Sequence, residues 1–216
     1  IYLNNSYGRA ALAPIIAAKS LNIPAVEQQH GVIGKNHFAY LIPRELDART
    51  EFPLCDRMAV WGNYTKRFLT AAEVYEPHQL RVCGFPRIDG LLGDLPEKAE
   101  TLSKLGIPAD ASVVLYTPNK FAQAFTSDIL DSIKRTEGSS DAYWVIKLHP
   151  AVKTEATWKG AIIRRQLQRV QVVGGGADFY ALLAACDVHV TFASTTLIEA
   201  AVLGKPNVGL RTGSTT

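Results

Sequence analysis

The stretch that decides the fold runs from residue 143 to residue 210. It contains the segments YWVIKLHP (residues 143–150), VQVVGGG (170–176), VHVTFASTT (188–196) and NVGL (207–210). Each contains a short apolar run rich in β-branched residues, which is typical of a strand buried on both faces of a parallel sheet. Residues 158–168, 179–185 and 196–203 separate these runs and have helical composition. The alternation predicts an α/β fold built on a doubly covered parallel sheet.

Polar residues follow the predicted strands at the points where the strands end. These residues are Lys147, His149 and Pro150 after the first strand, and Ser194, Thr195 and Thr196 after the third. The carboxyl ends of parallel strands form the edge where open α/β sheets bind ligands. Hydroxyls at the start of a helix, together with its free N–H groups and the positive end of its dipole, suit a phosphate. The sequence therefore predicts a nucleotide- or phosphate-binding half-domain.

Each of these positions also has a purely structural interpretation. His149 can donate to a phosphate oxygen, or it can satisfy a backbone carbonyl at the strand end. The hydroxyls of residues 194–196 can bind an oxyanion or simply cap the helix that follows. Glu199 can accept hydrogen bonds from a ribose diol or act as a capping-box glutamate. The three glycines at 174–176 favour a flexible turn, because they do not match a dinucleotide-binding fingerprint.

The first part of the chain predicts a further set of strands and helices. Strands are expected at residues 25–29, 57–61 and 80–83. Helices are expected at residues 9–21, with Pro14 tolerated only near the first turn, and at 64–74, with Asn63 as the cap. Residues 32–52 show no period and predict a long loop.

Histidines in this chain differ in their expected roles. His30 follows a predicted strand, precedes Gly31 and can face an open cleft, so it is a candidate general base for a hydroxyl acceptor. A histidine bonded within a loop fits the same position equally well. His78 lies in a polar connection and His189 alternates with core positions inside a strand, so both are interpreted as structural.

Composition places the chain among globular proteins. Of its 216 residues, 47% are apolar and 20% are charged, and the net charge of +3 is scattered, which argues against nucleic-acid binding. Three cysteines are too few for a disulfide framework, so reducing cytoplasmic conditions are expected, with Cys83 and Cys186 buried. No apolar run reaches the roughly 18 residues of a membrane span. The chain starts as if in mid-strand and stops just after a strand, so we expect it to be cut at both ends.

Five segments, taken in order, resemble one family. They are Gln29-His30-Gly31, GFPRID (residues 84–89), LYTPN (115–119), KLHP (147–150) and the segment 187–206. The set resembles the motifs of CDP-glycerol glycerophosphotransferases and related capsule transferases. Its His-Pro and Ser-Thr elements are also similar to those of bacterial sialyl-, polysialyl- and Kdo transferases. The turn at 84–89 is similar to one in UDP-N-acetylglucosamine 2-epimerases.

The resemblance implies two Rossmann-like parallel-sheet domains of the glycosyltransferase B type, with the N-terminal domain only partly present. Residues 1–85 would be the C-terminal part of the acceptor-side domain, and residues 86–216 the donor-binding domain. His30 would stand at the catalytic cleft and Glu199 at the donor ribose. The implied donor phosphate contacts are Lys147, His149, Pro150, Ser194, Thr195 and Thr196, and the implied cleft or hinge residues are Gly31, Arg87, Asp89, Pro118 and Asn119.

The implied activity is that of an inverting, metal-independent glycosyltransferase of surface or capsular polysaccharide synthesis. Phe192-Ala193 stands where the glycerophosphotransferases usually have Asp-Tyr, which favours a CMP-linked sugar donor. No cofactor or metal is expected, since the sequence has no Asp-x-Asp motif. The implied acceptor is a saccharide or lipid-linked glycan, met in the cytoplasm or at the inner face of its membrane through parts outside this chain. The alternatives are a CDP-glycerol-type transferase, a UDP-sugar 2-epimerase and a non-catalytic nucleotide-sugar-binding domain.

Overall fold

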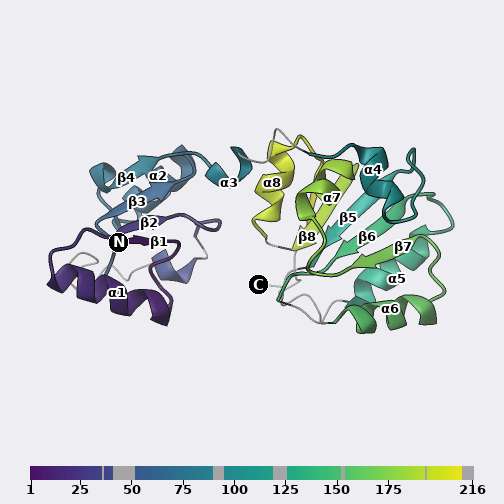
Figure 1. Ribbon diagram of the computed structural model, residues 1–216, viewed down its shortest axis with the longest axis horizontal. Coiled ribbons are helices and arrows are strands. Elements are labelled where there is room, and N and C mark those ends of the chain that lie inside the picture. Colours follow the sequence, from purple (N-terminus) through teal and green to yellow (C-terminus); the bar gives the residue numbers. More distant parts are fainter. Residues whose placement is uncertain are drawn as a thin grey trace. The chain divides into compact units, whose positions relative to one another are not determined.

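The chain folds into two compact units, Ile1–Gly90 and Leu91–Thr216, each built on a parallel sheet (Figure 1). The computed structural model describes residues 1–35, 37–40, 52–89, 95–118, 126–151, 154–192 and 194–210. The side chains of Phe38, Arg87 and Asp89 are outside this description. The domain boundary expected from the sequence, between residues 85 and 86, falls shortly before the division between the units.

The first unit carries a four-stranded sheet with the order β1-β2-β3-β4 among its described residues. Each strand pairs in parallel with the next, so that Leu3, Glu27 and Met58 lie side by side across the first three strands. The core contains Ile15 of the first helix, and Leu69 of the second packs against the third and fourth strands. The elements are β1 (Tyr2–Leu3), α1 (Arg9–Ser20), β2 (Val26–Gln28), η1 (Phe38–Tyr40), β3 (Arg57–Val60), α2 (Asn63–Ala71), η2 (Pro77–Gln79), β4 (Leu80–Val82) and α3 (Pro86–Asp89).

Three local expectations for the first unit were wrong. Pro14 lies well inside α1 rather than in its first turn, so the helix lacks one internal N–H donor there. The N-cap residue of α2 is Gly62, and Asn63 is already helical. Cys83 is exposed, whereas Cys186 is buried as expected. Most of the predicted loop at residues 32–52 lies outside the described residues.

The second unit carries a five-stranded parallel sheet with the order β7-β6-β5-β8-β9. The chain runs outward from β5 to β7, then crosses back and continues on the other side of β5. The predicted helices and strands are confirmed, with shifts of a few residues at some ends. The elements are α4 (Lys98–Ser103), β5 (Val113–Thr117), α5 (Thr126–Thr136), β6 (Tyr143–Lys147), α6 (Glu155–Arg164), β7 (Val170–Val173), α7 (Phe179–Ala185), β8 (Val188–Phe192), α8 (Thr196–Val202) and β9 (Asn207–Leu210).

Helices cover both faces of this second sheet, as the strand pattern predicted (Figure 1). On one face α5 and α6 pack against Tyr116 and Ile146, and Trp158 of α6 is fully buried in this cluster. On the other face α4, α7 and α8 pack against Leu115 and Val145. Consecutive residues of one strand therefore enter opposite cores, which explains why the strands read as continuous apolar runs. In the described part of the chain no helix is long and apolar enough to cross a membrane.

Candidate functional site

The strand order of the second unit creates a switch point between β5 and β8. The helices that follow these two strands, α5 and α8, pack on opposite faces of the sheet, and ligands of open α/β sheets bind at such a switch point. Thr117 and Pro118 stand at the end of β5, and both are buried. Ser194 and Thr196 follow β8, which is the strand that pairs with β5 on this side. The hydroxyl cluster singled out in the sequence therefore lies at the place where this fold binds ligands.

A chain of polar side chains, in which Thr117 and His189 are buried and Asn207 is exposed, links this edge to the interior of the sheet. Thr117 Oγ1 lies 2.8 Å from His189 Nε2 and 3.4 Å from Thr196 Oγ1. On the far side of the ring, His189 Nδ1 lies 2.8 Å from Asn207 Oδ1, while Asn207 Nδ2 donates to Leu197 O at 3.0 Å. The chain joins β5, β8, β9 and α8, so it fixes the start of α8 against the strand ends.

The hydrogen-bond partners determine how the protons of this chain are placed. Asn207 Oδ1 must accept, because the amide nitrogen of the same side chain already donates to Leu197. His189 therefore carries its proton on Nδ1, and its Nε2 accepts from the Thr117 hydroxyl. Burial lowers the pKa of His189, although the bond to Asn207 opposes that shift. The ring is neutral at neutral pH, and Thr117 Oγ1 is left to accept from Thr196.

The start of α8 has a different arrangement from a simple capped helix. Thr195 is the N-cap residue, yet its side chain makes no capping hydrogen bond. The backbone N–H of Thr196 donates to Ser194 Oγ at 3.3 Å, and the N–H of Leu197 reaches Ser194 O at 3.3 Å. The first amides of the helix thus already have acceptors within the turn. The groups that this edge offers a ligand are chiefly the hydroxyls of residues 194–196. Ala193, just before them, lies outside the described residues.

Glu199 is buried beneath this turn and is 4% exposed. Its Oε1 accepts a hydrogen bond of 2.7 Å from the hydroxyl of Tyr180, which comes from α7. It lies four residues after the N-cap residue Thr195, one beyond the third helical position that a capping box uses. The carboxylate therefore joins two helices on the face that carries α4, α7 and α8.

His149 stands at the end of β6 and is exposed, as is Pro150. Its Nδ1 accepts a hydrogen bond of 3.1 Å from the backbone N–H of Ala151. When the ring is neutral, its proton is therefore on Nε2, which is the nitrogen that can donate to an anionic ligand. Because β5 lies between β6 and β8, His149 and the hydroxyls of residues 194–196 emerge two strand spacings apart, about 10 Å.

Lys147 is buried at the last position of β6 and is 5% exposed. Its Nζ donates to Leu148 O and to Gly175 O, both at 3.0 Å. Burial lowers the pKa of the ammonium, while the charge of Asp178 acts in the opposite direction. Two of its three N–H groups are therefore occupied by carbonyls, and these bonds connect the loop after β7 to the end of β6.

The glycine run after β7 is explained by close packing within the protein. A Cβ atom on Gly175 would lie 2.5 Å from Pro150 Cα, and one on Gly174 would lie 2.8 Å from Glu155 Oε2. A Cβ on Gly176 would meet nothing within 4 Å. The flexible turn expected from the sequence misses this contact. Because Gly175 has no side chain, the turn at His149-Pro150 can pack directly against the loop after β7.

In the first unit, His30 and Gly31 follow β2 and are held by Gln29. The side chain of Gln29 accepts from Trp61 N and donates to Gly31 O, both at 2.8 Å. His30 itself is exposed, and its Nε2 lies 2.9 Å from the hydroxyl of Tyr7. The carboxyl edge of this sheet therefore presents a histidine with one ring nitrogen engaged by a tyrosine.

Sequence reasoning missed the polar groups whose partners are distant in the chain. They are Glu27, Tyr7 and Tyr40 in the first unit, and Thr117 and Tyr180 in the second. Glu27 left a signal, since it is an acidic residue in the middle of a buried strand. Three predicted positions remain open: the side chains of Arg87 and Asp89, and all of Asn119, lie outside the described residues. Pro118 closes β5 from a buried position.

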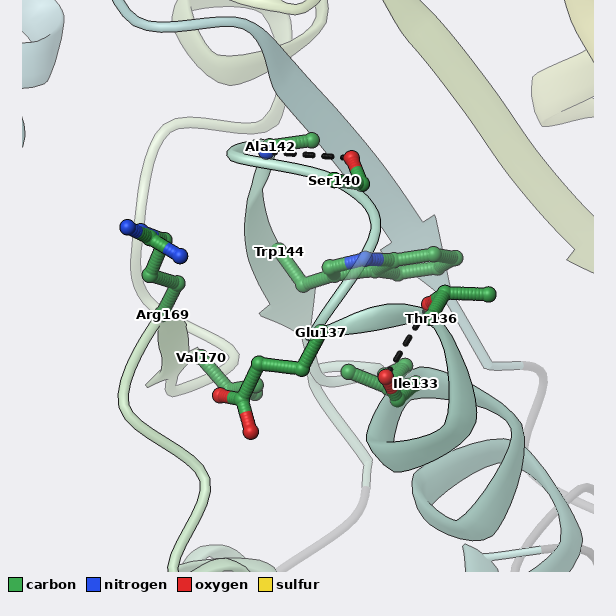
Figure 2. A pocket seen from close by; sticks show the side chains of 8 residues that line it. All are labelled: Ile133, Thr136, Glu137, Ser140, Ala142, Trp144, Arg169 and Val170. Carbon is green, nitrogen blue, oxygen red and sulfur yellow. Dashed lines mark hydrogen bonds between the residues drawn. The ribbon is translucent and has the colours of Figure 1, made fainter.

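Two cavities lined by described residues of the second unit lie at the amino edge of the sheet, away from these residues. One of about 10 Å³ lies between α5 and the starts of β6 and β7, where Trp144, Glu137 and Arg169 line it (Figure 2). Its volume is about that of one water molecule. A shallower polar hollow of about 610 Å³ shares Glu137 and Arg169 and adds Lys134. Neither is at the edge where this fold binds ligands, and no group of three metal-ligating side chains occurs among the described residues.

Comparison with solved structures identifies the fold. Anabaena Alr3699/HepE in complex with UDP and glucose is 19% identical, with a TM-score of 0.63 over 99% of this chain and 59% of that one. UDP-GlcNAc 2-epimerase from Neisseria meningitidis bound to UDP-GlcNAc is 20% identical, with a TM-score of 0.68 over 100% and 59%. The wall teichoic acid polymerase TagF with CDPG is 18% identical, with a TM-score of 0.56 over 86% and 48%. These likenesses confirm the predicted glycosyltransferase B class of fold.

The chain spans 48 to 59% of the length of these three structures. No match was found among curated protein sequences. A family model described as CDP-glycerol:poly(glycerophosphate) glycerophosphotransferase matches residues 18–210, which include all five motif segments in full. The resemblance inferred from those motifs is confirmed, and the chain belongs to the CDP-glycerol:poly(glycerophosphate) glycerophosphotransferase family.

Proposed function

We propose that the chain carries the donor-binding domain, and part of the acceptor-side domain, of a metal-independent transferase of surface-polymer synthesis. The enzyme would move a group from a cytidine nucleotide to a hydroxyl acceptor. The observation that carries the proposal is the family match over residues 18–210. The polar edge of the second unit, where His149 follows β6 and the hydroxyls of residues 194–196 follow β8 of the same sheet, agrees with it.

Two donors agree with the sequence and the family. CDP-glycerol is favoured by the description of the family. A CMP-linked sugar, with inversion at the transferred carbon, is favoured by Phe192-Ala193, which replaces the Asp-Tyr usual in the glycerophosphotransferases. Transfer from either donor releases CMP, so one nucleotide-binding edge would stabilise the same leaving group in both reactions.

The proposed chemistry needs a base on the acceptor side and anion stabilisation on the donor side. His30 would take the proton of the acceptor hydroxyl as its oxygen attacks the β-phosphorus of CDP-glycerol or the anomeric carbon of a CMP-sugar. The bond from that atom to the CMP oxygen breaks, and CMP leaves with the bonding electron pair. His149 Nε2–H and the hydroxyls of Ser194, Thr195 and Thr196 would stabilise the charge that develops on the phosphate. Glu199 would contact the ribose.

The remaining partners follow from this chemistry. The acceptor would be a saccharide or a lipid-linked glycan, which offers the hydroxyl that the transfer requires. Such an acceptor would be met at the inner face of the cytoplasmic membrane, with attachment through parts outside this chain. Pro118 and Asn119 would line the donor cleft, and Gly31, Arg87 and Asp89 its opposite wall and the hinge.

Replacement His149→Ala tests the donor site directly. We expect the affinity for CMP and CDP-glycerol, measured by titration calorimetry, to fall about 10- to 100-fold, because a hydrogen bond to a charged group contributes about 1.5–3 kcal/mol. His78→Ala is the matched control, since His78 is an exposed histidine of the first unit. An affinity that His149→Ala leaves unchanged would remove His149 from the donor site.

A thermal-shift panel separates the donors and the alternative functions. A ligand that binds only the folded protein raises its Tm by mass action. We expect shifts with CMP, CDP and CDP-glycerol and none with GDP. A larger shift with CDP-glycerol than with CMP would favour the glycerophosphotransferase reaction over sugar transfer. Conversion of UDP-GlcNAc to its 2-epimer would instead support an epimerase, and nucleotide binding without turnover in the presence of acceptor would support a binding domain.

A further inference from the structure

The carboxyl group of Glu27 is buried in the middle of β2, where its side chain is 0% exposed. Its Oε1 accepts a hydrogen bond of 3.2 Å from the backbone N–H of Ser6 and another from the hydroxyl of Tyr40. Its Oε2 is equally buried and has no hydrogen-bond partner among the described residues. A buried carboxyl with one oxygen unpaired costs folding free energy, so apolar packing alone does not explain it.

The two partners of Glu27 belong to the two loops that carry the His30–Tyr7 pair. Ser6 immediately precedes Tyr7 in the loop after β1, and Tyr40 closes the segment that follows β2 and His30. The Tyr7 hydroxyl lies 2.9 Å from His30 Nε2, and the Tyr7 ring stands edge-on to the Tyr40 ring with centroids 5.8 Å apart. One carboxylate oxygen therefore holds both loops at the carboxyl edge of the sheet.

Several ionisable groups surround Glu27 in the first unit. Burial is the largest influence on Glu27 and raises its pKa, while the bonds from Tyr40 and Ser6 and the charge of His30 lower it. Burial also raises the pKa of Tyr7, Tyr40, Tyr75 and Cys55, so these groups stay neutral at neutral pH. His37 packs against Tyr7 and Tyr40, and burial lowers its pKa. The groups that interact electrostatically with Glu27 are Tyr7, His30, Tyr40, Cys55 and Tyr75, of which His30 is the one that can become a cation.

The burial of Oε2 decides what Glu27 can do. Since the surrounding atoms cover it, a substrate cannot reach this oxygen, and Glu27 can act on a reaction only through Tyr40, Ser6 and its electric field. We propose that Glu27 is a positioning residue for His30: it holds the Tyr7–His30 pair in place and faces the imidazolium that forms when His30 takes the acceptor proton. The proposal rests on the role of His30 as base in the proposed function. Once His30 has taken the acceptor proton, the imidazolium and the Glu27 carboxylate stabilise each other.

The direct test follows the His30 imidazole by NMR as the pH is changed, in the chain labelled at histidine, with His30→Gln to assign its signal. Glu27→Gln keeps the size of the side chain and removes its charge. We expect the midpoint of the His30 signal to move to lower pH, because the imidazolium loses a nearby negative charge. Tyr40→Phe, which removes one bond to Glu27, should give a smaller shift in the same direction. Glu137→Gln alters a carboxylate of the second unit and should leave the midpoint unchanged.

An unchanged midpoint in folded Glu27→Gln overturns the proposal. If circular dichroism shows that this variant is unfolded, Tyr40→Phe decides in its place, and an unchanged midpoint there overturns the proposal as well. A second measurement uses the transfer reaction of the full chain: kcat of Glu27→Gln should fall at least about tenfold while KM for the donor stays constant, because the donor would bind the second unit. An unchanged His30 midpoint would not affect the assignment of the donor site. A His149→Ala variant that binds CMP normally would contradict the proposed function and would not affect the result for His30.

Discussion

His189 shows how a single polar side chain can be required in the middle of an apolar strand. It is fully buried in β8, yet both of its ring nitrogens are bonded, one to Asn207 and the other to Thr117. The structural role inferred from its alternation with core positions is correct as far as it goes. Its connection to Thr117 could not be predicted, because the two residues lie 72 positions apart and meet only when β5 pairs with β8.

The neutral state of His189 predicts a loss of stability in mild acid. The pKa of this group is lowered in the folded protein from its usual value of 6.5, mainly by burial. Below pH 6.5 the unfolded chain therefore binds a proton that the folded protein does not. As the pH is lowered, the free energy of unfolding should fall by at most about 1.4 kcal/mol per pH unit, until the folded ring is also protonated.

Urea unfolding at about pH 7.5 and about pH 5.5 measures this effect, with His189→Gln as the comparison. At the higher pH the variant should be less stable than the natural chain, because it loses bonds to Thr117 and Asn207. Its stability should also change less between the two values. A variant that loses as much stability as the natural chain would assign the acid sensitivity to other groups, such as His37 in the first unit.

The elements of the second unit were predictable because the central strands β5, β6 and β8 are largely buried and the helices α5 to α8 each follow a strand. The same pattern placed His149 and Ser194 at strand ends before the structure was known. It could not show which loops touch. Gly175 packs against Pro150 across the ends of β6 and β7, and Lys147 binds the carbonyl of Gly175. Such contacts depend on how loops lie against each other, which hydrophobic periodicity does not encode.

Replacement Gly175→Ala should disturb the loops after β6 and β7 together. The added Cβ would lie 2.5 Å from Pro150 Cα, so the backbone of one loop has to move. We expect a loss of about 1–3 kcal/mol in the free energy of unfolding, as in other overpacked sites, and weaker binding of CMP because His149 is displaced. Gly176→Ala is the matched control, since its Cβ would meet no atom within 4 Å. Equal effects of the two replacements would show that the close approach to Pro150 is unimportant.

The two units of the chain differ in how much of their candidate site could be predicted from the sequence. The motifs of the second unit indicated the family, and the family match confirms that prediction. The first unit offered His30 and Gly31, but its buried acid, Glu27, depends on Ser6 and Tyr40 from separate loops. A polar group inside a short strand can be recognised in a sequence, whereas the partners that give it a role cannot.

This division predicts where a nucleotide will be felt in the molecule. CMP should slow backbone amide exchange at residues 147–151 and 194–199, because a bound ligand stabilises the segments that hold it against local opening. Residues of the first unit should exchange at unchanged rates, since the nucleotide would contact only the second. The measurement is hydrogen–deuterium exchange read by mass spectrometry, with GDP as the control ligand. Protection around Lys134, Glu137 and Arg169 would place the nucleotide in the hollow at the amino edge instead. The pattern should persist in EDTA, and protection that disappears with EDTA and returns with Mg²⁺ would contradict a metal-independent donor site.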